Sequence, residues 1–294
     1  MSNIKIFRRM SFLVTGAAGF IGSHLLEKLP PDCIQCDVAS PQMKTIEQAL
    51  SLITPDSVDA VFHMGAISST TETDTLLIVE NNIRDSCMLL EKCLSQGVPF
   101  IYASSASVYG TGENGFAEDS LTMPLNYYAI SKASFDMFVL QKIKDNPSAR
   151  IYGLRYFNVY GTGEENKGAM ASPVHKFLNQ AECSREIQVF EGSERFKRDF
   201  IHIDDVTAIT LGALRFNNSG IYNVGTGRPR SFLDVATIIS NLTGARIKEI
   251  PFPAHLVGKY QKFTSSDNEK INLAGYRSNR ISLEDGIQRV LDGR

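Results

Sequence analysis

The fold is decided by the stretch Ser11-Phe-Leu-Val-Thr15-Gly16-Ala-Ala-Gly19-Phe-Ile-Gly22-Ser23-His-Leu-Leu-Glu-Lys-Leu29. Its apolar start predicts a short strand, its glycines predict a turn, and its end predicts a helix. In this order Gly16 makes the tight turn, Gly19 lets the backbone approach a pyrophosphate, and Gly22 lets the helix pack closely on the strand. The helix N-terminus adds free N–H groups. The stretch therefore predicts a dinucleotide site that includes Phe20 and Ile21, although a glycine spacing alone could be an ordinary turn.

Further short apolar runs, rich in β-forming residues, alternate with amphipathic segments along the chain. They predict strands at Val58–His63, Pro99–Ala103, Arg150–Phe157 and Phe200–Ile203. A βαβα order predicts an α/β fold with a doubly wound parallel sheet, Rossmann-like, and a smaller interleaved substrate domain. We expect residues 1–160 and 198–226 to form the dinucleotide-binding domain, and residues 161–197 and 227–294 to form the substrate-binding domain.

Two segments between these strands give further expectations. Between Gly22 and Val61 there is room for only one strand, Cys33–Cys36, and one helix, about Gln42–Ile53, because a βαβ unit needs roughly 30 residues or more. This half of the sheet should be one strand short. The segment Asp74–Gly97 predicts one helix that ends at Gly97. Its apolar stripe should pack on the sheet through Leu76, Val79, Ile83, Cys87, Leu90 and Leu94.

Composition excludes several classes of function. The chain has 294 residues, 43% of them hydrophobic and 21% charged, and a net charge of −2. These values are typical of a globular protein and give no basic surface for nucleic acid. No apolar run reaches the roughly 18 residues of a membrane span, so we expect a cytoplasmic protein without a membrane partner. The five cysteines are an odd number, and Cys33 and Cys36 lack further ligands nearby, so we expect neither a disulfide framework nor a metal site.

Hydroxyl and amine side chains that could carry chemistry follow the predicted strands. Tyr128 and Lys132 are four residues apart on a predicted helix, which places them on one face. A phenol is a poor base at neutral pH, and lowering its pKa by three units needs roughly 4 kcal/mol, which an ammonium and an oxidised nicotinamide could supply together. Ser105 ends a strand at the edge where such sheets bind ligands. If each motif is considered alone, Tyr128 and Lys132 are better explained as an exposed pair on a surface helix, and Ser105 as a residue that caps a turn. The three residues together, after a glycine turn, predict a catalytic set.

Further stretches of the chain make a family resemblance plain. They are Phe62-His-Met-Gly-Ala-Ile-Ser-Ser-Thr-Thr-Glu72, Arg155-Tyr-Phe-Asn-Val-Tyr-Gly161, Asn166-Lys-Gly-Ala-Met-Ala-Ser172, Phe190-Glu-Gly-Ser-Glu-Arg-Phe-Lys-Arg-Asp-Phe200, Tyr222-Asn-Val-Gly-Thr-Gly227, and Ile250-Pro-Phe-Pro253 through Lys259-Tyr-Gln261. With them the chain resembles the nucleotide-sugar enzymes of the extended short-chain dehydrogenase/reductase family. Lys167 with its flanks and the Phe-Glu-Gly-Ser run narrow the resemblance to the heptose epimerases.

The resemblance implies roles by position. The function implied is inversion at C6 of a nucleotide-activated heptose by transient oxidation with a retained NADP, or NAD, for lipopolysaccharide or a related glycan. Ser105, Tyr128 and Lys132 would be catalytic, with Lys167 as a second acid/base. The cofactor would be bound by Gly16, Gly19, Phe20, Ile21, Gly22, Asp37, Lys44, Gly65, Ala66, Ile67, Ser68, Asn81, Tyr128 and Lys132. The substrate would be bound by Ser105, Asn158, Ala169, Lys176, Phe190, Glu191, Gly192, Ser193, Arg198 and Tyr260. A homo-oligomer is implied as well.

Some of these roles also follow from the chemistry of the residues. Arg198 is suited to grip a diphosphate as a planar fork, while His202 and the acids after it more plausibly cap the next helix. An acid at Asp37 would repel the 2′-phosphate of NADP, and Lys44 could offset that repulsion. Lys167 could instead be a phosphate ligand.

Two departures and three rival functions bear on this interpretation. Ala169 stands where the resembled enzymes commonly carry a Ser, and the missing strand removes part of the adenine side of the cofactor site. A 4-epimerase of another nucleotide sugar would need only one base, which Lys167 argues against. A 4,6-dehydratase would carry an acid where Ala106 and Ser107 stand. A non-catalytic dinucleotide-sensing module could lose Tyr128 or Lys132, both of which are present.

Overall fold

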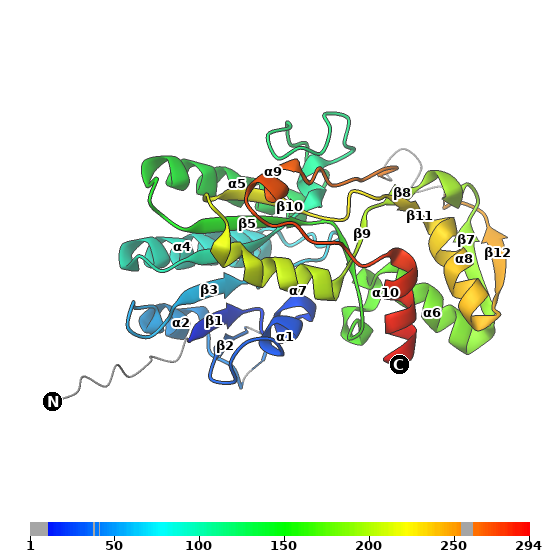
Figure 1. Cartoon of the computed structure of the whole chain (residues 1–294), viewed down its shortest axis with the longest axis horizontal. Coiled ribbons are helices and arrows are strands. Elements are labelled where there is room, and N and C mark those ends of the chain that lie inside the picture. Colours follow the sequence, from blue (N-terminus) through cyan, green and yellow to red (C-terminus); the bar gives the residue numbers. More distant parts are fainter. Residues whose placement is uncertain (1–10, 38, 41, 254–260) are drawn as a thin grey trace.

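The computed structural model describes residues 11–37, 39–40, 42–253 and 261–294, and shows a large parallel sheet beside a smaller group of elements (Figure 1). In the described residues the sheet has six strands in the order β10-β5-β4-β3-β1-β2, all pairs parallel. Their bounds are β1 (Phe12–Thr15), β2 (Ile34–Cys36), β3 (Ala60–His63), β4 (Phe100–Ser105), β5 (Ile151–Tyr156) and β10 (Gly220–Val224). The predicted α/β class and doubly wound parallel sheet are confirmed.

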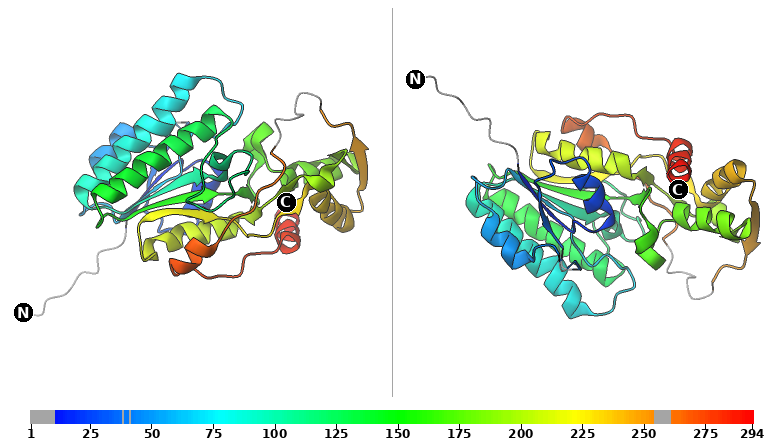
Figure 2. Two further views of the ribbon diagram at one scale, coloured as in Figure 1. Left: turned by 90° about the horizontal axis from the view of Figure 1, so that it is seen from above. Right: turned by 90° about the horizontal axis from the view of Figure 1, so that it is seen from below.

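Helices cover both faces of this sheet (Figure 2). One face packs against α2 (Ile46–Leu52), α4 (Asp85–Gln96) and α5 (Tyr127–Asp145), and the other against α1 (Phe20–Leu26), α7 (Ile203–Gly212) and α9 (Glu269–Leu273). Alternate residues of β1 point into the two cores. Phe12 and Val14 lie in the core beside α1 and α7, and Leu13 lies in the core beside α2 and α4. Both faces are therefore buried, as the uniformly apolar strands require.

The half of the sheet beyond β1 is short, as the spacing predicted. Only β2 and α2 lie between α1 and β3 in the part of the chain that the structure describes. Beyond β1 the sheet therefore has one strand, β2, where the usual order 3-2-1-4-5-6 has two. Cys33 and Cys36 enter cores on opposite faces of this edge. They cannot act as a redox pair in this arrangement.

The segment from Asp74 to Gly97 is not the single helix that its pattern predicted. It consists of α3 (Thr75–Ile78), a π-helical stretch η1 (Val79–Arg84) and α4, and it ends at Gly97 in the left-handed conformation, as predicted. The wider π turns rotate the apolar stripe. Leu76 and Val79 are therefore 75% and 47% exposed, which contradicts their predicted place against the sheet.

A second group of elements packs around its own core. It contains α6 (Pro173–Ser184), β7 (Glu186–Phe190), α8 (Phe232–Thr243), β12 (Arg246–Ile250) and α10 (Leu283–Asp292), with β7 and β12 paired in parallel. Short pairs connect the two groups: β6 (Asn158–Tyr160) with β9 (Phe200–His202), and β8 (Lys197–Arg198) with β11 (Arg230–Ser231). The strand predicted near Phe200 thus exists, but it pairs outside the central sheet.

The predicted domain boundary differs from the packing in one place. Residues 227–294 were assigned to the substrate domain, but α9 places Ile271 and Ala274 in the core of the large sheet. The other short helical elements in the described residues are 3₁₀ helices: η2 (Ala106–Tyr109), η3 (Glu165–Met170, kinked at Gly168), η4 (Ser193–Arg195) and η5 (Ala213–Arg215).

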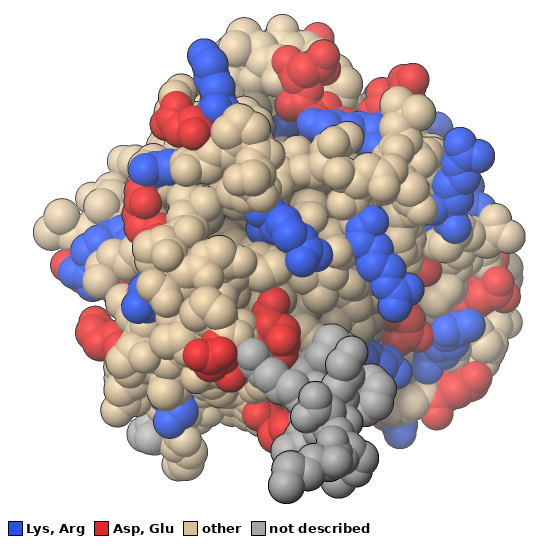
Figure 3. Space-filling model, turned by 60° about the vertical axis from the view of Figure 1, so that its left-hand side comes forward, with Lys and Arg blue, Asp and Glu red and all other residues tan. Residues whose placement is uncertain are grey.

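The surface and the helices bear on the expected partners. Charges of both signs are interspersed on the face that Figure 3 shows. Across the described residues, no helix is long and apolar enough to cross a membrane, and no three His, Cys, Asp or Glu side chains are grouped so that they could hold a metal ion.

Candidate active site

The largest collection of predicted site residues surrounds one cavity of about 650 Å³ at the carboxyl ends of the central strands. Its walls are the glycine turn after β1, the loops after β2, β3, β4 and β5, the start of α5, and η3. Strand order reverses between β1 and β3, and open α/β sheets bind ligands at that switch point. The topology therefore places the cavity where a dinucleotide is expected.

The glycine turn is fixed by close backbone contacts. Gly16 has φ +64°, and a Cβ there would lie 2.5 Å from the backbone nitrogen of Gly65. A Cβ on Gly22 would lie 2.0 Å from the Gly16 carbonyl oxygen. Gly16, Gly19, Phe20, Ile21 and Gly22 all line the cavity. Only glycine fits at Gly16 and Gly22, so the turn stays tight and its backbone lies in the cavity wall, where a pyrophosphate is expected.

Most of the other predicted cofactor residues also line the cavity. Gly65, Ala66, Ile67, Ser68 and Asn81 form its wall beside β3. Asp37 lies at the end of β2, where its carboxylate accepts hydrogen bonds from the backbone N–H groups of Ala18 and Ala39, both at 2.9 Å. Asp85 at the start of α4 lines the same end. Lys44 does not line the cavity: it is exposed, and its backbone pairs with β2, so its predicted cofactor role is not supported.

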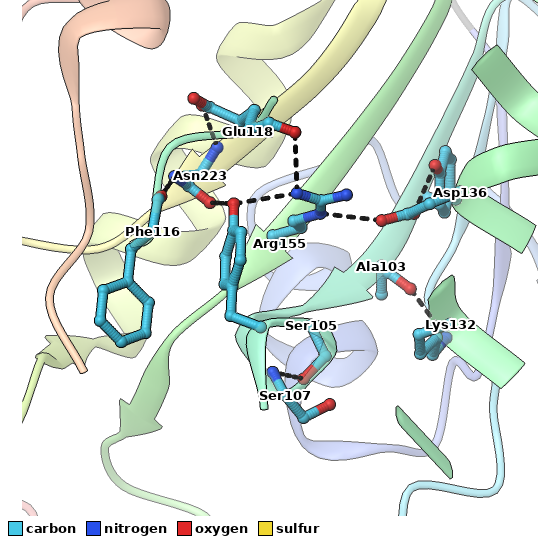
Figure 4. A network of polar contacts seen from close by, with 11 residues as sticks. Ala103, Ser105, Ser107, Phe116, Glu118, Lys132, Asp136, Arg155 and Asn223 are labelled. Carbon is cyan, nitrogen blue, oxygen red and sulfur yellow. Dashed lines mark hydrogen bonds and ion pairs between the residues drawn. The ribbon is translucent and has the colours of Figure 1, made fainter. Parts of the chain in front are cut away.

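Ser105, Tyr128 and Lys132 meet at the centre of the cavity. Asn126 caps α5 by accepting a hydrogen bond from the Ala129 N–H, so the helix begins just before Tyr128. The Lys132 Nζ donates to the Ala103 carbonyl at 2.7 Å and lies 5.9 Å from the Tyr128 ring centroid. Figure 4 shows Lys132 directed at Ala103 with Ser105 close by on the same strand. The four-residue spacing therefore places both side chains on the cavity face of α5.

The protonation of this set follows from burial. Burial lowers the pKa of Lys132 to about 8, although the charge of Asp136 opposes the shift. Burial also raises the pKa of Tyr128, and a hydrogen bond with Ser105 offsets this only in part. The raised pKa of Tyr128 in the structure differs from the lowering expected beside Lys132. A bound, positively charged nicotinamide would add to the stabilisation of the phenolate.

A buried polar network supports the set from behind (Figure 4). The Asp136 carboxylate accepts from Tyr102 Oη and from Arg155 Nε, each at 2.8 Å. Arg155 Nη1 also donates to Tyr109 Oη at 2.9 Å, and Tyr109 donates to Asn223 Oδ1 at 2.7 Å. The network therefore ties α5 to β4, β5 and β10, and the ends of β4 and β5 form part of the cavity wall.

Lys167 reaches the same cavity from the opposite wall. It lies in η3, and its Nζ is 4.3 Å from the centroid of the Phe20 ring and 2.8 Å from Glu164 Oε2. Gly168, the next residue, has φ +50° and turns the chain sharply. The fold thus brings a second amine into the space that Tyr128 faces, from a segment 39 residues further along the chain.

Comparison with known proteins assigns the family. Residues 12–225 match the NAD dependent epimerase/dehydratase family. The chain belongs to this family. Relatives named ADP-L-glycero-D-manno-heptose-6-epimerase are 39% identical in Brachyspira hyodysenteriae and 40% identical in Alkalilimnicola ehrlichii, each covering 95% of this chain and 96% of the relative.

Solved structures of the epimerase/dehydratase family agree in fold. The Helicobacter pylori ADP-L-glycero-D-manno-heptose-6-epimerase superposes with a TM-score of 0.82 at 28% identity, covering 97% of this chain and 96% of that one. The UDP-glucose 4-epimerase of Thermotoga maritima superposes with a TM-score of 0.82 at 27% identity, covering 96% and 98%. The resemblance stated from the motifs is confirmed.

Several predicted substrate residues lie outside the walls of this epimerase/dehydratase cavity. Asn158 lines it, but Lys176 donates to the Ala169 carbonyl, and Phe190 packs edge to face on Phe252. Glu191, Gly192 and Ser193 follow β7, and Ser193 is buried. Arg198 is 6% exposed, and its guanidinium donates hydrogen bonds to the backbone carbonyls of Lys197 and Gln261. In this structure the guanidinium therefore binds the main chain. Tyr260 lies outside the described residues.

The structure also adds residues that the sequence did not single out. His63 lines the cavity, hydrogen-bonded to Thr15 Oγ1 at 2.6 Å and Ser86 Oγ at 2.8 Å, and burial lowers its pKa to about 3. It is therefore a neutral structural link between β1, β3 and α4. Glu164 was missed because Glu164-Glu165 looks like a solvated acidic loop. His202, by contrast, caps α7 by accepting from the Asp204 N–H, as predicted.

Proposed function

We propose that this chain inverts the configuration at C6 of an ADP-activated heptose by transient oxidation and re-reduction. The observation that carries the proposal is the presence of a second proton-transfer group, Lys167, in the cavity that holds Ser105, Tyr128 and Lys132. Relatives with nearly full coverage carry the name of that reaction, which supports the same substrate here.

Each of these residues has a separate role in the proposed reaction. Ser105 hydrogen-bonds the reacting oxygen, and Tyr128 takes the proton from the C6 hydroxyl while C6 becomes a ketone. When bound, the nicotinamide cofactor supplies a reversible hydride acceptor. Rotation about the bond next to the ketone moves its oxygen away from Tyr128, so a second group must meet it on the other side. Lys167 gives that oxygen its proton, and in the reverse direction the two residues exchange roles.

The nearest rival is epimerisation at C4 of another nucleotide sugar, in which the sugar pivots about its diphosphate and one base suffices. That mechanism needs no second acid/base at the position of Lys167. A binding experiment cannot separate the two functions, but product analysis can. Purified protein incubated with each ADP-heptose epimer and, separately, with UDP-glucose should yield the C6 epimer by NMR and no C4 epimer. The opposite pattern would overturn the proposal.

Membership of the family indicates that the cofactor is a nicotinamide dinucleotide. The sequence led us to expect NADP rather than NAD. The charges around the cavity favour NAD instead. Asp37 and Asp85 line the end beyond the glycine turn, while the only Lys and Arg side chains on the described walls, Lys132 and Lys167, belong to the catalytic end. A 2′-phosphate beside two carboxylates would be repelled. We therefore propose NAD.

Binding isotherms of both oxidised cofactors test this choice. NAD should bind more tightly than NADP. The variant Asp37→Asn should reduce the difference in affinity between the two cofactors, and Lys44→Ala should change neither isotherm. Tighter binding of NADP, lost in Lys44→Ala, would restore the original expectation.

For the substrate, we retain the predicted set as a proposal: Asn158, Ala169, Lys176, Phe190, Glu191, Gly192, Ser193, Arg198 and Tyr260. Ser105 of the catalytic set belongs to it as well, and its support is that α6, β7 and β12 form a separate packed unit beside the cavity. We likewise propose residues 161–197 and 227–294, apart from α9, as the substrate-binding domain. The cytoplasmic location stays a prediction.

For assembly, we propose a homo-oligomer formed through α5. Ile130, Met137 and Leu140 of α5 are 44–69% exposed, and Leu76 and Val79 are exposed on the neighbouring α3 and η1. Exposed apolar side chains that gather on adjacent helices mark an interaction surface when they form a patch, and we propose such a patch here. Sedimentation should show an oligomer that Met137→Glu dissociates; a monomeric native chain would contradict the proposal.

A further inference from the structure

Glu164 is an acidic side chain that the proposed chemistry does not use, yet it is wholly buried. It directly precedes η3, and its relative exposure is 0%. Acidic residues are almost never fully buried unless they are paired, because removing a carboxylate from water is costly. Its burial therefore needs an explanation from its neighbours.

The Glu164 carboxylate is surrounded by donors. Oε1 accepts from the Gly161 N–H at 3.2 Å and from Ser172 Oγ at 2.7 Å, and Oε2 accepts from the Ser172 N–H at 2.7 Å and from Lys167 Nζ at 2.8 Å. Four donors on two oxygens, with no acceptor opposite them in these contacts, match an ionised carboxylate. Lys167 is thus the cationic partner of a buried anion.

The same contacts attach Lys167 to rigid parts of the fold. Ser172 is the N-cap of α6, and its Oγ also accepts from the His175 N–H. Gly161 follows β6. On its other side the Lys167 ammonium faces the Phe20 ring of α1. A lysine side chain carries roughly 2 kcal/mol of rotamer entropy, and the carboxylate on one side and the ring on the other restrict that freedom.

We propose that Glu164 is the positioning residue for Lys167, holding its ammonium at the cavity wall so that it meets the substrate oxygen on the side away from Tyr128. Glu164 does not itself line the described cavity, so it acts only through Lys167. The inference rests on the proposed function of Lys167.

A double-mutant cycle on the holoenzyme tests the proposal. The variants are Glu164→Gln, Lys167→Met and the double variant, with Glu165→Gln as the matched control, because Glu165 is adjacent and exposed. Glu164→Gln should lower kcat for interconversion of the ADP-heptose epimers by up to about 10²-fold, the loss that a misplacement of roughly 1 Å can cause, with KM nearly unchanged. Added to Lys167→Met it should cause no further loss. An equal loss in both backgrounds, or an effect on KM alone, would overturn the proposal.

If Glu164→Gln does not fold, Glu164→Asp replaces it, because it keeps the charge and withdraws the carboxylate by one methylene group. It should lower kcat in the wild-type background and leave Lys167→Met unaffected. A kcat equal to that of the wild type would contradict the positioning role.

A second readout does not depend on the reaction. N-hydroxysuccinimide acetate should acylate Lys167 several-fold faster in Glu164→Gln than in wild type or Glu165→Gln, measured by peptide mass spectrometry with the exposed Lys144 as internal reference. Unchanged labelling would overturn the inference even in an active epimerase. Faster labelling in a protein that makes no epimer would leave the positioning intact and reject the proposed function instead.

Discussion

Asp136 is the residue on which the placement of the first catalytic group depends most. It lies one turn beyond Lys132 on α5, and its carboxylate accepts hydrogen bonds from Tyr102 of β4 and Arg155 of β5 (Figure 4). The Asp136 and Arg155 side chains are only 2% and 3% exposed. Replacing Asp136 with Asn keeps the shape of the side chain and removes its charge.

The expected cost follows from this burial. Breaking a buried ion pair on one side costs about 3–5 kcal/mol, because the other charge remains unpaired away from water. In Asp136→Asn the guanidinium keeps two neutral acceptors, Tyr109 Oη at 2.9 Å and the Glu118 carbonyl at 3.1 Å. We therefore expect the lower end of that range, about 3 kcal/mol. Tyr102→Phe removes only one donor and leaves the ion pair, so it should cost about 1–2 kcal/mol.

Equilibrium unfolding in urea, followed by circular dichroism, measures both free energies. Asp145→Asn is the control, since Asp145 is exposed at the end of the same helix. A loss of about 3 kcal/mol corresponds to a fall in Tm on the order of 5 °C for a chain of this length. If Asp136→Asn unfolds within about 1 kcal/mol of the control, or if Tyr102→Phe costs more than Asp136→Asn, the ion pair does not support α5 as argued.

Three further outcomes are expected. Tyr128→Phe should lower kcat by about 10²–10⁴-fold while cofactor binding and Tm stay unchanged, because the ring packs alike but transfers no proton; near-normal turnover would reject the assignment. The pKa of Lys132 is lowered to about 8, so its ammonium is present below that pH and lost above it, and kcat/KM should fall as the pH rises through about 8. The variant Lys132→Arg stays charged and should remove that fall. A pH profile that the substitution leaves unchanged would contradict the role of Lys132. Gly22→Ala should weaken cofactor binding and destabilise the protein by about 1–3 kcal/mol, because its Cβ would lie 2.0 Å from the Gly16 carbonyl oxygen. The control is Gly220→Ala, whose Cβ would contact Tyr222 at an ordinary distance of 3.5 Å.

The parts of the fold that the sequence predicted correctly depend on local rules. The turn at Gly16 needs a residue that tolerates positive φ, and Gly97 ends its helix for the same reason. The missing strand followed from the number of residues available between Gly22 and Val61. The spacing of Tyr128 and Lys132 fixed their common face because the segment is a regular α-helix.

The parts that the sequence did not predict depend on departures from regularity or on distant partners. The exposure of Leu76 and Val79 results from π-helical turns, which a 3.6-residue periodicity does not represent. Arg155 and Asp136 pair across two elements that only the sheet order brings together. Lys44 was assigned because its charge could offset the repulsion between Asp37 and a 2′-phosphate, but its backbone pairs with β2 and its side chain does not line the cavity.

The two proton-transfer groups are held by different means, and this difference has a functional consequence. Tyr128 lies on a helix of 19 residues that a buried network ties to three strands. Lys167 lies on a single turn, next to a glycine with φ +50°, and in the described residues its side chain is restrained by the Glu164 carboxylate and the Phe20 ring. Substitutions around Lys167 should therefore reduce the proton transfer on the side away from Tyr128, whereas substitutions behind Tyr128 should reduce stability and all hydride transfer together. Variants of η3 and Glu164 are thus better suited than variants of the central sheet to separate the two proton transfers.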